Sequence, residues 1–208
     1  FLKKKIYSTA ELSLTFILMA VKKVNQFNEL TKNFFWNRYE YEINEFDNYK
    51  IGIIGNGRVG RILSKQLKLL RFNVVKYDKH ENKKSLYNLL KSSDVISIHI
   101  PAKNNKNFIN KDKLEICKKD VSIINTSRGE VINEKDLINF LKKNKYANAF
   151  IDVINNEQRR IMNIKNNKII LYQKKNKNLF ITPHIGGVSL KARQITQDLI
   201  VNKFLNKM

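Results

Sequence analysis

The chain has 208 residues, of which 42% are hydrophobic, so it can bury a core and is not expected to be disordered. Its single cysteine, Cys117, excludes an intrachain disulfide framework and favours a reducing compartment such as the cytoplasm. No apolar run approaches the ~20 residues of a membrane-spanning helix, so an integral membrane protein is not expected, and neither is a metal site.

The charge is strongly positive, because 40 lysines and arginines stand against 18 acidic residues and leave a net charge of +22. Such a charge can indicate a nucleic-acid or anionic-membrane partner. The lysines are scattered, however, and the abundance of Lys, Asn, Ile, Phe and Tyr beside only 7 Gly and 2 Pro is what an AT-rich coding sequence produces. We therefore favour compositional drift and expect no nucleic-acid or membrane partner.

Residues 1–49 are predicted to form a helix followed by an arm. The basic and then apolar start imitates a signal peptide, but Glu11 heads the apolar run, and Ser8 and Glu11 have the spacing of a capping box. The pattern predicts a helix over residues 10–24 that is buried on most sides. Residues 25–49 lack clear periodicity and are interpreted as an arm or linker with one anchor, Trp36.

Apolar runs of strand length alternate with helical patterns from Lys50 onward. Strands are predicted at 51–54, 73–77, 95–100, 121–125, 149–151 and 179–182, and helices at 59–70, 84–91, 111–118 and 134–143. This alternation predicts an α/β fold with a Rossmann-type, doubly wound parallel sheet over residues 50–187. The Lys/Asn-rich residues 158–178 are predicted to be a surface excursion. Residues 188–208 are predicted to end in a helix from residue 189 with Val201, Leu205 and Met208 on one face.

A glycine-rich turn, Gly55-Asn-Gly57-Arg58-Val59-Gly60, directly follows the first of these strands and opens a helix. In that context G-x-G-x-x-G predicts a dinucleotide site, with the pyrophosphate at the helix N-terminus. Gly55 would permit the tight turn, Gly57 the close approach of backbone to pyrophosphate, and Gly60 close packing of helix on strand. Asp78, which lies 18 residues after Gly60, could accept both ribose hydroxyls and would repel a 2′-phosphate. The sequence therefore predicts NAD as the cofactor.

Polar clusters also follow later predicted strands, at residues 125–130, 152–157 and 182–187. The carboxyl ends of strands are where open α/β sheets bind ligands. His99 stands at another strand end, where we expect a packing or cofactor contact and no catalytic role. Cys117 lies in a helical pattern and is expected to be buried and inert.

Taken together, these segments resemble the nucleotide-binding domain of the D-isomer-specific 2-hydroxyacid dehydrogenases. The matching segments, in order along the chain, are STAELSLTFILMAVKK, GNGRVG, the pair Tyr77–Asp78, SDVISIHIP, INTSRGEVINEKDL, AFIDV followed by Glu157, and NLFITPHIGG. The resemblance implies an NAD-dependent oxidoreductase that acts on the CH–OH group of a D-2-hydroxy acid. Phosphoglycerate dehydrogenase is the favoured type. A glyoxylate/hydroxypyruvate reductase, or a non-catalytic NAD-sensing module similar to a corepressor, is the alternative.

The resemblance also implies roles for individual residues. Arg128 would bind the substrate carboxylate and carbonyl, His184 would be the acid/base, and Glu157 would hold His184. Asp152 would contact the nicotinamide carboxamide. The residues expected to contact the cofactor are Gly55, Gly57, Arg58, Val59, Gly60, Asp78, His99, Pro101, Thr126, Ser127, Arg128, Asp152, His184 and Gly187.

The residue types suit that chemistry independently of the resemblance. Reduction of a 2-keto acid needs a hydride and a proton, and imidazole exchanges a proton near neutral pH. A neighbouring carboxylate favours the protonated ring, and a planar guanidinium can bind a carboxylate through two hydrogen bonds.

The resemblance further implies what accompanies this domain. The family's separate substrate-binding domain has no counterpart here, and the chain starts at Phe1, so we expect a fragment or truncated product. Residues 1–49 resemble the interdomain helix and dimerisation arm, which implies a homodimer. Residues 188–208 resemble the crossover back toward the substrate-binding domain.

Overall fold

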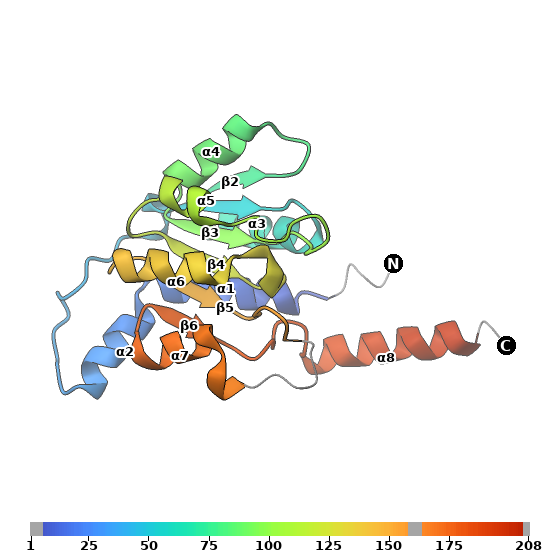
Figure 1. The fold of residues 1–208 in the computed structure, drawn as a ribbon. Coiled ribbons are helices and arrows are strands. Elements are labelled where there is room, and N and C mark those ends of the chain that lie inside the picture. Colours follow the sequence, from blue (N-terminus) through green and yellow to red (C-terminus); the bar gives the residue numbers. More distant parts are fainter. Residues whose placement is uncertain (1–5, 158–163, 206–208) are drawn as a thin grey trace.

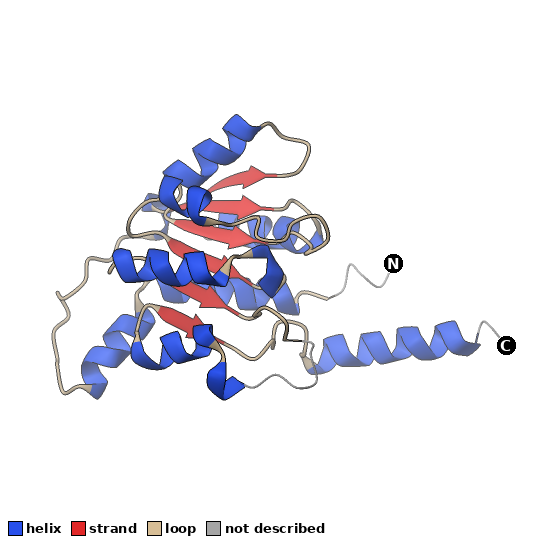
Figure 2. Ribbon diagram, viewed as in Figure 1, coloured by secondary structure: helices blue, strands red, loops and turns tan. Residues whose placement is uncertain are grey.

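One parallel sheet organises the protein in a computed structural model that describes residues 6–157 and 164–205. The strand order is β2-β1-β3-β4-β5-β6, and every neighbouring pair is parallel, as the common direction of the arrows in Figure 2 shows. The strands are β1 (Lys50–Ile54), β2 (Asn73–Tyr77), β3 (Val95–Ile98), β4 (Ser122–Asn125), β5 (Asn148–Ile151) and β6 (Leu179–Ile181). The predicted Rossmann-type fold is confirmed.

Helices cover both faces of the sheet (Figure 1). The helices of the described part are α1 (Ser8–Val21), α2 (Val24–Lys32), α3 (Arg58–Leu69), α4 (Lys83–Ser92), α5 (Lys111–Ile116), α6 (Glu134–Lys143), α7 (Lys168–Lys175) and α8 (Leu190–Leu205), and all but α2 and α8 pack on the sheet. One apolar cluster joins the sheet to α4–α7, and a second joins it to α1 and α3. Successive strand residues such as Ile123 and Ile124 belong to opposite clusters, because side chains alternate across a strand. Burial on both faces explains why the inner strands β1, β3, β4 and β5 are mostly apolar, whereas the edge strand β2 also carries exposed polar residues.

The predicted strands and helices agree with the observed ones to within about two residues at most ends. β3 is shorter than the predicted strand 95–100. After Ile98, the N–H of His99 still bonds to the carbonyl of Ile54 at 2.7 Å, but Pro101 has no N–H to continue a ladder.

The N-terminal helix differs from the prediction in its two ends. It begins at Ser8, with Tyr7 as a cap that makes no side-chain hydrogen bond, so the capping box of Ser8 and Glu11 is wrong. It ends at Val21, because Lys23 adopts a left-handed conformation with φ 51° and a second helix starts at Val24. The helix is buried or half-buried on most sides, as predicted, and exposes only Glu11 and Thr15.

The arm contains more regular structure than residues 25–49 suggested. Its first third is α2, and a short 3-10 helix spans Phe46–Asn48. Phe46 stacks on Phe72 with 4.6 Å between ring centroids, which ties the end of the arm to the core. The expected anchor, Trp36, is 89% exposed, so it is available to a partner and packs little against its own chain.

The two C-terminal predictions are partly corrected. Within 158–178, α7 buries Ile169 and Tyr172, so it is a core helix, while residues 158–163 lie outside the described part. In Figure 1, α8 extends away from the sheet. Of its predicted face, Val201 is 55% exposed, whereas the side chain of Leu205 and all of Met208 lie outside the described part.

Two further expectations concern single features. Cys117 is buried, its thiol bonds to the carbonyl of Lys113 at 3.2 Å, and burial raises its pKa to about 12, so the thiol stays protonated. Within residues 6–157 and 164–205, no helix combines the length and apolar character needed to cross a membrane.

Candidate active site

A cleft of about 490 Å³ lies at the carboxyl ends of the strands. Beside it, the chain order reverses between β1 and β3, which is the position where doubly wound sheets bind ligands. Ten of the predicted residues line the cleft: Arg58, Val59, His99, Pro101, Thr126, Ser127, Arg128, Asp152, His184 and Gly187. Tertiary folding therefore brings together segments separated by more than a hundred residues.

The glycine-rich turn has the geometry that its predicted roles require. Gly55 has φ +101°, and a Cβ there would lie 2.6 Å from the carbonyl oxygen of His99. A Cβ on Gly60 would collide with the carbonyl oxygen of Gly55, so the helix α3 can approach the turn only through a glycine. A Cβ on Gly57 would meet no atom within 4 Å, which leaves space beside the N-terminus of α3 for a ligand.

Asp78 lies beside this turn at the end of β2. Its carboxylate accepts the N–H of Asn56 at 2.8 Å and that of Lys79 at 2.7 Å. These bonds, that from Lys79 above all, lower the pKa of Asp78. The side chain is therefore held as an anion next to the glycine-rich turn. Neither Asp78 nor the three glycines of the turn line the cleft of about 490 Å³.

Asn125 shapes the loop that carries Arg128. This buried amide accepts hydrogen bonds from the N–H and hydroxyl of Ser127, at 3.0 and 2.8 Å, and donates to the carbonyl of Arg128 at 3.0 Å. The guanidinium of Arg128 is exposed and donates to the carbonyl of Ser127 at 2.6 Å. The buried Asn125 thus fixes the loop, while the guanidinium of Arg128 stays accessible to solvent.

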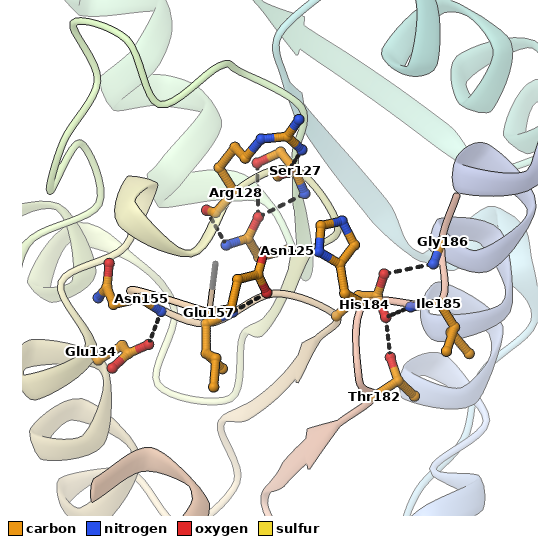
Figure 3. Close-up of polar contacts among 12 residues, drawn as sticks. Asn125, Ser127, Arg128, Glu134, Asn155, Glu157, Thr182, His184, Ile185 and Gly186 are labelled. Atoms are coloured by element: carbon orange, nitrogen blue, oxygen red, sulfur yellow. Dashed lines mark hydrogen bonds and ion pairs between the residues drawn. The ribbon is translucent and has the colours of Figure 1, made fainter. Parts of the chain in front are cut away.

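A second loop, residues 152–157, packs directly on the first. A Cβ on Gly129 would overlap the backbone of Ile154, so only glycine allows this approach. On the outer side, the carboxylate of Glu134 accepts the N–H of Asn155 at 2.7 Å (Figure 3), and burial raises the pKa of Glu134. The two loops are therefore fixed relative to each other.

His184 and Glu157 form an ion pair in Figure 3, with 2.8 Å between Nδ1 and Oε1. Glu157 is 15% exposed and also accepts the N–H of Ile154 at 3.3 Å, whereas His184 is 44% exposed. The carboxylate therefore holds one ring nitrogen, and the ring faces the cleft. His184 has a left-handed backbone with φ 56°, an uncommon conformation for a residue with a Cβ.

Asp152 has a further role that the sequence did not indicate. Its buried carboxylate accepts the hydroxyl of Thr182 at 2.5 Å and the N–H groups of Ile185 and Gly186, both at 2.7 Å (Figure 3). These three bonds fix the turn that carries His184. The expected contact of Asp152 with a nicotinamide carboxamide remains a prediction.

Sequence reasoning missed three residues that line the cleft, namely Thr9, Ile100 and Gly186. Thr9 and Ser13 are hydroxyl residues one turn apart on a helix that is otherwise apolar on that face, and this spacing was the available signal. In the described part of the chain, no group of three or more His, Cys, Asp and Glu could hold a metal ion.

His99 is half-buried, its Nε2 lies 2.8 Å from the hydroxyl of Ser97, and burial lowers its pKa to about 4. An unfolded chain takes up this proton below about 6.5 and the folded protein only near 4, so stability falls as the pH drops through that window. We expect the free energy of unfolding in urea to be about 1–2 kcal/mol lower at pH 5 than at pH 7 because of His99.

The variant His99→Gln, which can still bond to Ser97, should remove that part of the pH dependence. The exposed His80 supplies the control, since His80→Gln should leave the dependence in place. Equal slopes for both variants and the parent would contradict the assignment.

Comparisons with known proteins agree with this geometry. Residues 14–186 match the family described as D-isomer specific 2-hydroxyacid dehydrogenase, NAD binding domain. The chain is 34% identical over 177 residues to the hydroxypyruvate reductase of Blautia hydrogenotrophica, covering 80% of the chain and 52% of that protein. It is also 34% identical over 208 residues to the D-3-phosphoglycerate dehydrogenase of Haemophilus influenzae, covering 95% of the chain and 50% of that protein.

Solved structures show the same fold. The Aquifex aeolicus D-lactate dehydrogenase complexed with NAD and lactic acid superposes with a TM-score of 0.83 at 27% identity, covering 96% of this chain and 66% of that one. The chain spans about half the length of the curated relatives it matches. On the match over residues 14–186, the chain belongs to the D-isomer specific 2-hydroxyacid dehydrogenase family and carries its NAD-binding domain.

Proposed function

We propose that the chain forms the cofactor-binding and acid–base part of an NAD-dependent dehydrogenase that interconverts a 2-keto acid and a D-2-hydroxy acid. The observation that carries the proposal is the 2.8 Å ion pair of His184 and Glu157, with His184 and Arg128 lining the same cleft. A protonated imidazole and a guanidinium in one cleft supply the proton donor and the carboxylate partner that the reaction needs.

The glycine-rich turn and Asp78 fit the cofactor. The space over Gly57 and the N-terminus of α3 suit a pyrophosphate, and the anionic Asp78 beside them suits ribose hydroxyls. When bound, the cofactor supplies or takes up the hydride. In the reducing direction, His184 donates a proton to the carbonyl oxygen, Glu157 stabilises the protonated ring, and Arg128 holds the substrate carboxylate.

The direct test measures NADH oxidation by the protein purified at its natural length, with any further domain that it carries, in the presence of a panel of 2-keto acids. The similarity to D-3-phosphoglycerate dehydrogenases favours the 2-keto acid formed by oxidation of 3-phosphoglycerate, and the relative from Blautia hydrogenotrophica makes hydroxypyruvate the alternative. A similar glyoxylate reductase, from Thermococcus litoralis, adds glyoxylate to the panel. Turnover that depends on one of these acids supports the proposal. NADH binding without turnover of any of them would instead favour an NAD-sensing module.

The +22 charge favours the NAD-sensing module as the second candidate function, because a strongly basic protein can bind DNA through its phosphates. DNA binding that weakens steeply with salt and changes with NADH would support it. DNA binding that does not change when NADH is added would contradict an NAD-sensing role on DNA.

Asp78 should set the preference for NADH over NADPH. Its carboxylate, held as an anion by the N–H groups of Asn56 and Lys79, would repel a 2′-phosphate. We expect the parent to bind NADH at least tenfold more tightly than NADPH, on the order of one charge–charge contact. In Asp78→Asn, the Kd values for NADH and NADPH should lie closer together than in the parent, as measured by fluorescence titration with each cofactor. Equal affinities in the parent would contradict this role.

A homodimer in the cytoplasm is the proposed state of the protein. Phe34, Trp36 and Tyr39 are 100%, 89% and 85% exposed, and an aromatic patch of this kind is typical of an interface. The buried, free Cys117 suits a reducing compartment. Sedimentation of the parent as a dimer and of Trp36→Ala as a weaker dimer would support this state. A soluble parent monomer at tens of micromolar would contradict it.

A further inference from the structure

We propose that the first turns of α1 act as a brace that sets the positions of the Arg128 and His184 loops, with Thr9 and Ser13 as positioning residues. The inference rests on the proposed function for its catalytic consequence, but the brace itself is a structural statement. Both residues precede the segment 14–186 that matches the family.

The first connection runs from α1 to the loop after β6. The hydroxyl of Thr9 donates to the carbonyl of Gly186 at 3.0 Å, across 177 residues of sequence. The N–H of Gly186 also donates to the carboxylate of Asp152 at 2.7 Å. A Cβ on Gly186 would lie 3.4 Å from Leu12 and 3.6 Å from Thr9, so α1 packs closely on this turn. The turn that carries His184 is therefore held from α1 as well as from the sheet.

The second connection runs from α1 to the loop after β4. The hydroxyl of Ser13, which is fully buried, lies 2.7 Å from that of Thr126 and 2.7 Å from the carbonyl of Thr9. A serine hydroxyl has one proton. Since Ser13 donates it to Thr9, the hydroxyl of Thr126 is the donor to Ser13. Thr126 precedes Ser127 and Arg128, so this bond fixes the start of the loop that carries Arg128.

The brace has a rigid base. Phe16 and Ile17, on the same face of α1, are 1% and 0% exposed. The ring of Phe16 lies 6.0 Å from that of Phe150 in β5 and 5.9 Å from that of Phe180 in β6. A helix packed on the strands can hold both loops at a fixed spacing, whereas loops alone are the mobile part of such a fold. Reaction requires the proton donor and the carboxylate partner to keep that spacing within a fraction of an ångström.

One more contact places a third loop at the same end of α1. The guanidinium of Arg58, at the start of α3, donates to the carbonyl of Ile6 at 2.9 Å. The segment just before α1 thus contacts the start of α3, while α1 itself contacts the loops that follow β4 and β6.

The test removes the two hydroxyls with little change of shape, in the double variant Thr9→Val/Ser13→Ala. The matched control is Thr15→Val, because Thr15 is exposed and makes the same kind of backbone bond, to Glu11 at 2.9 Å, without touching a loop. The rescue variant Thr9→Ser/Ser13→Ala restores the hydroxyl that bonds to Gly186. All variants are made in the purified protein used for the NADH oxidation assay.

Hydrogen exchange read by mass spectrometry decides the brace without any assumption about activity. In the double variant, we expect exchange in residues 126–130 and 182–188 to become roughly two- to tenfold faster, the effect of one lost hydrogen bond at each loop. Exchange in the strands should not change, and Thr15→Val should match the parent. Unchanged loops, or equally faster exchange in the strands, would overturn the proposal.

The catalytic consequence is read separately. The double variant should lose roughly tenfold or more in kcat for 2-keto acid reduction, and the rescue variant, which restores one of the two hydroxyls, should recover part of kcat. A double variant with the parent's kcat would overturn the positioning role. If the parent itself turns over no keto acid, the proposed function fails, while the exchange result still decides whether the brace exists.

Discussion

Replacing His184 with alanine is expected to slow 2-keto acid reduction roughly 10²–10⁴-fold, the span of general acid–base catalysis. His184 lines the cleft and its Nδ1 is held by Glu157. His99 lines the same cleft, but it bonds to Ser97 and burial lowers its pKa to about 4, so it is not a protonated donor near neutral pH. Steady-state kinetics measure the loss. The Kd for NADH should change little, and near-parent activity would contradict the assignment of His184.

Glu157→Gln tests the other half of the pair. Glu157 holds Nδ1 of His184 at 2.8 Å, which we propose fixes the ring in the orientation that the reaction needs. Glutamine keeps the shape and removes the charge, so kcat for 2-keto acid reduction should fall roughly tenfold or more. A variant with the parent's kcat would remove Glu157 from the mechanism.

Arg128→Ala should affect a different kinetic constant. The exposed guanidinium is proposed to bind the substrate carboxylate, so its loss should raise the KM for the keto acid sharply. A change confined to the Kd for NADH would place Arg128 on the cofactor and not on the substrate.

Adding a methyl group at Gly60 and at Gly57 should have different effects: the first should lower stability, and the second should lower the affinity for NADH. In Gly60→Ala the new Cβ would collide with the carbonyl oxygen of Gly55, and we expect a loss of about 1–3 kcal/mol or more in the free energy of unfolding. In Gly57→Ala the Cβ meets no protein atom within 4 Å, so stability should stay within about 0.5 kcal/mol of the parent.

The affinity for NADH should distinguish Gly57→Ala from Gly60→Ala. The Cβ of Gly57→Ala would occupy the space where the pyrophosphate is proposed to approach, so NADH affinity should fall at least tenfold, the loss of about one good hydrogen bond to a charged group. Urea unfolding and a fluorescence titration on both variants measure the two quantities. A stable Gly57→Ala protein that binds NADH like the parent would place the pyrophosphate elsewhere.

The sequence by itself predicted the sheet, most of its helices and the glycine-rich turn. Apolar runs such as Ile51–Ile54 and the helical spacing of Leu63 and Leu67 are local patterns, and local patterns survive without knowledge of the fold. It also predicted that Arg128, Glu157 and His184 act together, although that rested on a resemblance to a known family. Their ion pair and shared cleft are observations of the structure.

Local patterns failed where the chain carried conflicting or weak signals. Val21 and Val24 both lie in the segment predicted to form one helix, but two lysines stand between them, and the left-handed Lys23 divides the segment into two helices. The prediction missed α2 although Val24, Phe27 and Leu30 recur every third residue, because the helix has only 9 residues and none of them is buried.

Only the tertiary structure decided how the loops of the site are held. The approach of Gly129 to Ile154, the three bonds to Asp152 and the reach of Thr9 to Gly186 join residues distant in sequence. Such contacts leave no periodic trace, because each depends on one side chain meeting one backbone atom at a place that the packing of α1 and the sheet defines. The sequence therefore determines which groups can do the chemistry, and the packing of distant segments determines that they face one cleft.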